Sequence, residues 1–172
     1  LPAAAFARNP LLRNVTSVNS PVVTDQSVYP IHPTPGVNRG YDANTLRPDG
    51  TLAKATATCG AVVYRGDLFG PAYRGNAFIP EPAANVVKRI VLTEQDGVVK
   101  GAAAVPGQEF LASTDERFRP VQVVNGPDGA IYIVDMYRGI IQHQGFLTHY
   151  LVANIKDRKL EQPVNRGRIW RI

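Results

Sequence analysis

From residue 60 onward, short runs of apolar residues alternate with groups of turn residues. Such runs, rich in β-branched and aromatic residues and bounded by Gly, Pro, Asn and Asp, predict short β-strands. The Asp96-Gly97 pair is a two-residue hairpin signal, and Pro127-Asp128-Gly129 predicts a tight turn. We therefore predict strands at residues 61–64, 76–79, 86–93, 98–100, 110–112, 121–124, 130–136 and 167–172. Residues 130–136 are almost continuously apolar, which predicts a strand covered on both faces.

One segment carries a helical pattern instead. Within residues 146–161, an approximate apolar stripe is formed by Leu147, Tyr150, Leu151 and Ile155, and Pro163 ends the pattern. We predict a helix inserted between the outer strands of the second group.

Residues 1–58 show little periodicity and contain many prolines. Each proline removes a backbone donor and restricts the residue before it, so regular strand pairing cannot extend far. We predict an extended arm that lies on a larger body. The apolar residues that could anchor it are Val22, Val23, Val28, Tyr29, Ile31, Val37 and Tyr41.

The predicted fold class is all-β, with residues 1–58 as the arm and 59–172 as about two groups of antiparallel strands. Such groups packed around an axis are propeller blades. Two blades cannot close a ring, and their faces would stay exposed. The chain begins at Leu1 and its only methionine is Met136, so we expect a processed product or part of a longer protein. A self-contained small β domain with a binding role is the alternative.

The composition and the charge of the chain argue against several classes of function. The formal net charge is +5, but the basic residues are scattered except for Arg166, Arg168 and Arg171, so we expect no nucleic-acid binding. No apolar run is long enough to span a membrane. Cys59 is the only cysteine, and because CxxCH is absent, this segment attaches no c-type haem.

Three stretches of the sequence are similar, in the same order, to a known protein family. They are VVYRGDLFGPAYRGNAFIPEPAANVVKRIVL, ERFRPVQVVNGPDGAIYIVDMYRG and the final GRIWRI. Together they resemble the last blades of the soluble quinoprotein glucose and sorbosone dehydrogenase family, which implies a six-bladed propeller. DQSVYPIHPTPGVNRGY, at residues 25–41, resembles a subgroup of large secreted bacterial proteins in which helical repeats and a c-type cytochrome domain follow the propeller.

The resemblance implies that Arg117 and Arg119 bind the carboxylates of pyrroloquinoline quinone (PQQ). The chemistry is suitable, because guanidinium groups bind carboxylates bidentately. Residues two apart in a strand also point to the same side. The alternative is a structural role, in which both arginines pair with Asp115, Glu116 or other acids.

Two positions depart from the family pattern. Ala83 occupies the place of a basic residue that faces the cofactor, and Glu81 would repel a polyanion. The resemblance places the catalytic histidine and the calcium ligands in earlier blades, so this chain lacks the catalytic-base region. The three histidines (His32, His143 and His149) are not spaced as a metal cluster, and we interpret them as surface or packing residues.

Two function hypotheses stay open. The first is an enzyme in which the complete propeller, with PQQ and calcium, oxidises a sugar hydroxyl or aldehyde and passes electrons to a cytochrome. The second is a non-enzymatic propeller that serves as a scaffold or interaction module in a larger extracellular assembly. The resemblance implies a periplasmic or extracellular location, with the remaining blades, in the same or another chain, as partners.

Overall fold

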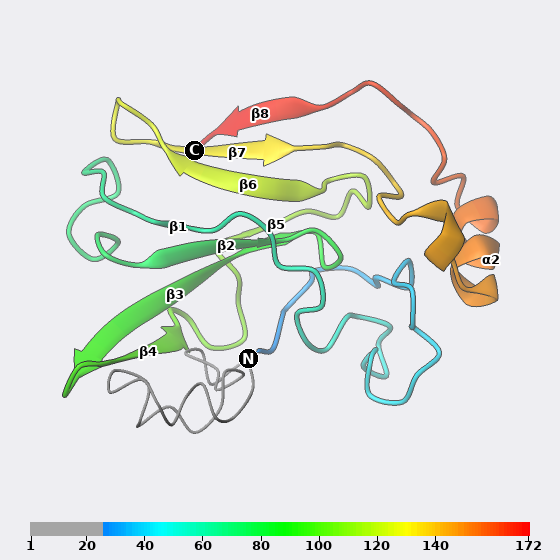
Figure 1. The fold of residues 1–172 in the computed structure, drawn as a ribbon, viewed down its shortest axis with the longest axis horizontal. Coiled ribbons are helices and arrows are strands. Elements are labelled where there is room, and N and C mark those ends of the chain that lie inside the picture. The colour runs from blue at the N-terminus through cyan, green and yellow to red at the C-terminus, as the bar shows by residue number, and fades with distance from the viewer. Residues whose placement is uncertain (1–25) are drawn as a thin grey trace, which may run out of the picture.

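The computed structural model describes residues 26–172, whose named strands form two antiparallel sheets (Figure 1). In the first sheet, β1 (Val62–Val63), β2 (Ala77–Glu81), β3 (Val86–Gln95) and β4 (Val98–Ala103) lie side by side in chain order, and β5 (Leu111–Ala112) pairs with the start of β3. The second sheet contains β6 (Pro120–Asn125), β7 (Ile131–Asp135) and β8 (Arg168–Arg171). The predicted all-β class is confirmed, and each predicted strand has a counterpart within a few residues.

Two turns follow directly from the turn residues. Asp96 and Gly97 have φ angles of 53° and 74°, which is the left-handed pair that a tight hairpin between β3 and β4 requires. Asn85 has a φ angle of 58° at the turn between β2 and β3. Its buried side chain donates to the carbonyl oxygens of Phe118 (2.7 Å) and Glu116 (3.3 Å), which fixes this turn beside the chain that leads into β6.

The alternation of side chains along β3 gives the first sheet two different faces. Val87 packs in the cluster shared with the second sheet, whereas Val86 packs against the arm. Lys88 lies on the same face as Val86, and its ammonium donates to the carbonyl oxygen of Ser27 and to Glu109 (3.0 Å). One face of β3 therefore joins the two sheets, and the other face binds the arm.

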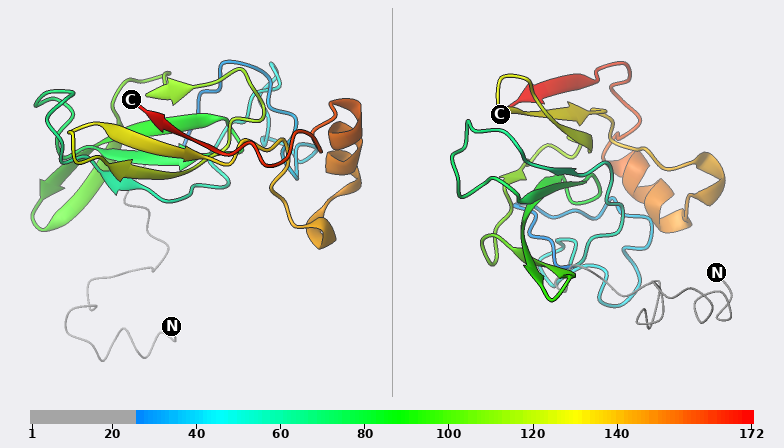
Figure 2. Two further views of the ribbon diagram at one scale, coloured as in Figure 1. Left: turned by 90° about the horizontal axis from the view of Figure 1, so that it is seen from above. Right: turned by 60° about the vertical axis from the view of Figure 1, so that its left-hand side comes forward.

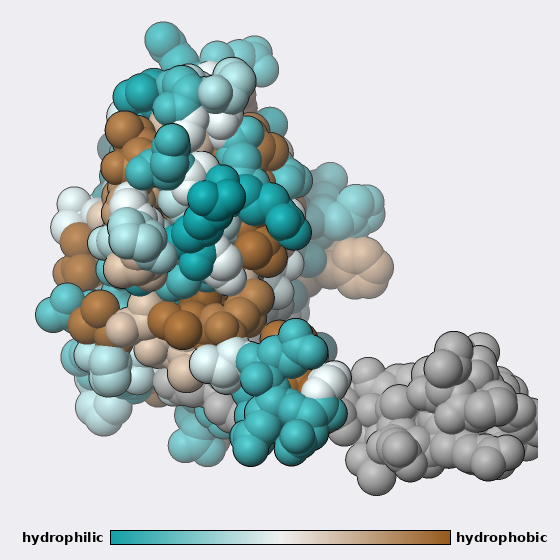
Figure 3. Space-filling view, turned by 90° about the vertical axis from the view of Figure 1, so that its left-hand side faces the viewer, coloured by the Kyte–Doolittle hydropathy of each residue, from teal (hydrophilic) through white to brown (hydrophobic). Residues whose placement is uncertain are grey.

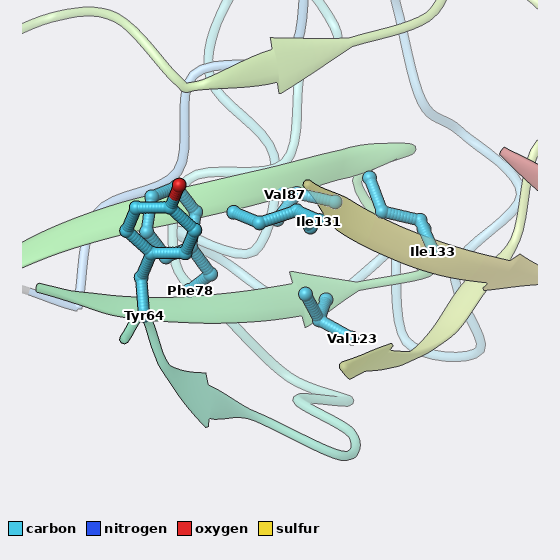
Figure 4. Packing of buried hydrophobic residues seen from close by; sticks show 6 residues of the cluster. All are labelled: Tyr64, Phe78, Val87, Val123, Ile131 and Ile133. Carbon is cyan, nitrogen blue, oxygen red and sulfur yellow. The ribbon is translucent and has the colours of Figure 1, made fainter. Parts of the chain in front are cut away.

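The core between the two sheets is aromatic at one end and aliphatic at the other (Figure 4). On β7, Ile131 and Ile133 are fully buried, but Tyr132 and Val134 are only half-buried. The prediction that this strand is covered on both faces was therefore wrong, because within the described residues only one face of the second sheet packs on another sheet. The buried members are Tyr64, Phe78, Val87, Val123, Ile131 and Ile133.

Residues 26–58 form an ordered arm without named strands. Its internal order comes from Arg47, whose guanidinium donates to the carbonyl oxygens of Val28 (2.7 Å) and Leu52 (2.7 Å). Val28, Val37 and Leu52 are buried against the first sheet. Ile31 and Tyr41 are each 60% exposed, so neither is a buried anchor of the arm, although the ring of Tyr41 contacts that of Tyr150 edge-on (5.9 Å between centroids). Val22 and Val23 lie outside the described residues.

The predicted helix exists but is shorter than residues 146–161. Helix α2 (His149–Asp157) begins after Thr148, whose hydroxyl oxygen accepts from the N–H of Leu151 (3.2 Å). A single turn of 3-10 helix, η2 (Gln144–Phe146), precedes it. Helix α2 and much of the arm lie at one end of the sheets, opposite the β3–β4 and β6–β7 turns (Figures 1 and 2). The hairpin end carries interspersed hydrophilic and hydrophobic residues (Figure 3).

Tyr64 supplies a test of this packing. Its hydroxyl donates to the carbonyl oxygen of Gly129 (2.5 Å) and accepts from the N–H of Phe69 (3.2 Å), which connects both sheets. Tyr64→Phe leaves these buried partners unsatisfied, so we expect it to lower the free energy of unfolding by about 1–3 kcal/mol. Tyr132→Phe removes a hydroxyl that donates to Asp128 at an exposed site, so it should cost less than about 1 kcal/mol. Equal losses in urea denaturation of the two variants would contradict this assignment.

Candidate functional site

A pocket of about 540 Å³ lies where the arm, the first sheet and the helical segment meet. Gly36 and Ala57 of the arm line one side, and Ala83 of the β2–β3 turn and Arg119 line another. The loop after β7 and helix α2 complete the wall, the latter through Leu151. The pocket is therefore built by segments that are far apart in the sequence.

Arg119 is buried, with 5% of its surface exposed, and its guanidinium holds three backbone carbonyls. Nη1 donates to Pro82 (2.6 Å), Nη2 to Gly139 (2.7 Å) and Nε to Arg138 (3.1 Å). Its own N–H donates to Oδ1 of Asp135 (2.8 Å). This residue thus ties the β2–β3 turn to the loop that follows β7.

The charge of Arg119 is unusual for so buried a group. Burial lowers the pKa of Arg119 to about 10, so the guanidinium stays protonated at neutral pH. Among residues 26–172 it forms no ion pair with a carboxylate. Nη1 and Nη2 each carry a second N–H beyond those that bind Pro82 and Gly139. A buried cation without a carboxylate partner, on the wall of a pocket, can bind an anion.

The side chain of Arg117 makes its hydrogen bonds outside the pocket. Its guanidinium donates to the carbonyl oxygens of Gln162 (2.8 Å) and Lys159 (3.2 Å), beyond the end of α2, and it does not line the pocket. The expected convergence of Arg117 and Arg119 on one side is not found. Both residues precede β6, which starts at Pro120, so the alternation of a strand does not govern their directions.

Helix α2 is fastened at both ends, which fixes its side of the pocket. At its start, the hydroxyl of Thr148 donates to the carbonyl oxygen of Asn38 (2.6 Å), and the hydroxyl of Tyr150 donates to that of Pro35 (2.9 Å). At its end, Nε of Arg158 donates to Glu116 (2.9 Å). The arm and the segment before β6 therefore hold α2 between them.

Glu81 faces the arm. Its carboxylate is fully buried and accepts hydrogen bonds at both oxygens from the N–H of Ala57 (3.1 and 3.0 Å). Burial raises the pKa of Glu81 above its ordinary value. The hydrogen bonds from backbone N–H groups, of which that of Ala57 has the largest effect, lower this pKa but do not cancel the rise. The neighbouring Ala83 lines the pocket.

His32 makes a contact with a residue distant in the sequence, and His143 makes a local one. Nε2 of His32 lies 3.2 Å from Oδ1 of Asn85, and Nδ1 of His143 accepts from the N–H of Gly145 (3.1 Å), where it caps η2. In the part of the chain that the structure describes, no group of three or more His, Cys, Asp or Glu residues could hold a metal ion.

Several pocket residues were missed by sequence reasoning. Arg39 and Asp42 of the arm and Gln142 after β7 line the pocket with polar side chains. They occupy irregular segments, where no periodicity or motif marks them. Only the arrangement of the arm against the loop after β7 brings them together.

The chain belongs to the family described as a domain of unknown function, DUF7133. The family model matches residues 1–172. No curated protein and no solved structure matches the chain. For this DUF7133 domain, no helix among residues 26–172 is long and apolar enough to cross a membrane.

Substitution of the two arginines separates their structural roles. Arg119→Met removes the side-chain donors of the carbonyls of Pro82, Arg138 and Gly139, of which Pro82 keeps only a long hydrogen bond from the N–H of Asn85 (3.4 Å), so it should lower the free energy of unfolding by about 3 kcal/mol. Arg117→Met should cost less than about 1 kcal/mol, because its contacts are exposed and water can replace them. Chemical denaturation measures both, and a smaller loss for Arg119→Met than for Arg117→Met would contradict the arrangement.

The dependence of protein stability on pH tests the burial of the Glu81 carboxyl group. Because its pKa is raised in the folded state, folding binds its proton more tightly, and this contribution to stability is lost as the pH rises through the folded pKa. Relative to Glu81→Gln, the wild-type protein should therefore become more stable as the pH falls from neutral through the raised pKa toward the ordinary glutamate value of 4.5. Thermal denaturation of both proteins across this range provides the measurement, and parallel curves would refute a raised pKa.

Proposed function

We propose that this chain forms two blades of a six-bladed propeller and one wall of its ligand pocket, in an exported protein that resembles the quinoprotein sugar dehydrogenases. The four-stranded meander of β1–β4 and the three-stranded meander of β6–β8 support the propeller, because they pack against each other as successive blades do. The other blades and a c-type cytochrome would be the partners.

The position of Arg119 carries the proposal for the ligand. Its guanidinium is buried, charged and without a carboxylate partner among the described residues, and it lines the pocket together with Ala83. The carboxylates of Glu116, Glu81 and Asp115 act on this charge without a direct ion pair, and a ligand with a carboxylate would pair with the two remaining N–H groups directly. PQQ belongs to this class of ligand. When bound, with calcium, it would supply the electron acceptor for oxidation of a sugar hydroxyl or aldehyde.

The fit to PQQ is partial. Arg119 suits one carboxylate, whereas Arg117 is directed to the carbonyls of Lys159 and Gln162 and lies outside the pocket lining. Glu81 is turned to Ala57, so its carboxylate is already used in holding the arm. Of the two arginines that the resemblance implies, only Arg119 lines the pocket, so we assign the anion contact to Arg119 and not to Arg117.

A second candidate function is a non-enzymatic scaffold or interaction module. The hydrogen bonds of Arg117 and Arg119 to backbone carbonyls favour it, because they explain both arginines without any ligand. Ala83 also favours it, since the pocket lacks a basic side chain there.

Substitutions at Ala83 test the ligand without disturbing the structural bonds of Arg119. In the complete natural protein titrated with PQQ and calcium, Ala83→Lys should tighten PQQ binding by about tenfold or more, because a charged hydrogen bond contributes about 1.5–3 kcal/mol. Ala83→Glu should weaken binding by a similar factor. Tryptophan fluorescence would follow binding, and sugar-dependent dye reduction would follow turnover.

The matched control is Ala102→Lys, which adds the same charge at an exposed position of β4 outside the pocket lining. Its affinity for PQQ should equal that of the wild-type protein. Absence of saturable binding to both the wild-type protein and Ala83→Lys would exclude the PQQ proposal and favour the scaffold.

A further inference from the structure

The described lining of the pocket contains a second cation besides Arg119. Arg39, on the arm, lines the same pocket, and its side chain is exposed, whereas Arg119 is 5% exposed. Asp42 is the one acidic residue of this lining, so positive charge exceeds negative charge there. The pocket thus has one buried and one exposed guanidinium, from two segments that are far apart in the sequence.

The residue before Arg39 is fixed to the helical segment by three hydrogen bonds. Oδ1 of Asn38 accepts from the N–H of Thr148 (3.1 Å), and its carbonyl oxygen accepts from the hydroxyl of Thr148 (2.6 Å). Nδ2 of Asn38 donates to the carbonyl oxygen of Phe146 (2.9 Å). The chain on this side of Arg39 therefore has a defined position against the start of α2.

The residues after Arg39 are fixed as well. Gly40 lies against α2 so closely that a Cβ atom there would be 2.4 Å from the hydroxyl oxygen of Tyr150. The N–H of Gly40 donates to the carbonyl oxygen of the buried Val37 (3.3 Å). The carbonyl oxygen of Arg39 accepts from the N–H of Asp42 (2.9 Å). Tight turns on both sides thus hold the backbone of Arg39 at one place in the pocket wall.

The guanidinium of Arg39, in contrast to its backbone, is not used within the fold. Among residues 26–172 it makes no ion pair and no hydrogen bond. Arg47 of the same arm differs, because its guanidinium donates to backbone carbonyls. A guanidinium that extends from a fixed backbone can bind a carboxylate, and little ordering of the chain is then required.

Arg39 also supplies what two other positions do not. The resemblance implies a cation at Ala83 and another at Arg117, but Ala83 has no charge and Arg117 lies outside the pocket lining. The arm brings Arg39 into the same pocket from a different direction. A ligand with a single carboxylate would need Arg119 only, so a second cation suits a ligand with at least two carboxylates.

We propose that Arg39 is a second anion-binding residue of the pocket, and that the pocket takes a polycarboxylate, with one carboxylate on Arg119 and another on Arg39. This inference rests on the proposed pocket for a carboxylate ligand, but it does not require that the ligand be PQQ.

Titration of the complete natural protein with PQQ and calcium tests the role of Arg39. Arg39→Gln removes one exposed cation from the lining, so PQQ should bind about fivefold more weakly, the effect of one exposed charge pair. Arg39→Lys keeps the charge and should bind within about twofold of the wild-type protein. Isothermal titration calorimetry measures the dissociation constants.

The matched control is Arg74→Gln, which removes an exposed arginine of the β1–β2 loop outside the pocket lining. It should leave the affinity unchanged, and an equal loss in this variant would show a general effect of charge and overturn the assignment. The urea midpoint of Arg39→Gln should match that of the wild-type protein, because the contacts that fix this turn involve the backbone of Arg39 and not its guanidinium.

Citrate is a second probe, because it carries several carboxylates but no quinone. It should also bind about fivefold more weakly to Arg39→Gln than to the wild-type protein. Equal affinities of these two proteins for either ligand that binds would overturn the role of Arg39 and leave that of Arg119 in place.

The two probes separate this inference from the proposed function. If PQQ does not bind but citrate does, and more weakly to Arg39→Gln, PQQ is excluded and the polycarboxylate pocket with Arg39 stands. If neither ligand binds the wild-type protein, the PQQ proposal and the role of Arg39 both fail.

Discussion

The buried guanidinium of Arg119 connects segments that are far apart in the sequence, and the pocket depends on this connection. Its three hydrogen bonds join Pro82, at the β2–β3 turn of the first sheet, to Arg138 and Gly139, after the last residue of β7 in the second. A buried arginine can satisfy several carbonyls at once because its donors are fixed in a planar fork. Without this fork, the β2–β3 turn and the loop after β7 would lose these hydrogen bonds, and the carbonyls of Arg138 and Gly139 would lose their side-chain donors.

A second constraint is the alternation of β3. The face that carries Val87 packs on the second sheet, and the face that carries Val86 and Lys88 holds the arm. Glu81, which lies opposite Val86 in the sheet, extends the arm-binding face and accepts from the N–H of Ala57. The arm is therefore fixed by both apolar burial and buried charged groups. This explains how a proline-rich segment without strands forms a defined wall of the pocket.

The pocket combines side chains from segments that have no regular structure. Its lining includes the buried guanidinium of Arg119 and the polar residues Arg39, Asp42 and Gln142 of the arm and of the loop after β7. A concave site with a few placed polar groups is typical of small-molecule sites in proteins.

The sequence by itself determined the strands and most of the turns. Apolar runs between turn residues located all eight strands, and Asp96-Gly97 indicated a hairpin, because these features depend on neighbours in the chain. The directions of Arg117 and Arg119, the contact of Glu81 with Ala57 and the exposure of Tyr41 were decided only by the tertiary structure. The direction and the contacts of each of these side chains, and the exposure of Tyr41, depend on segments that are distant in the sequence. Local periodicity carries no information about such partners, since they are brought together only when the sheets, arm and helix pack.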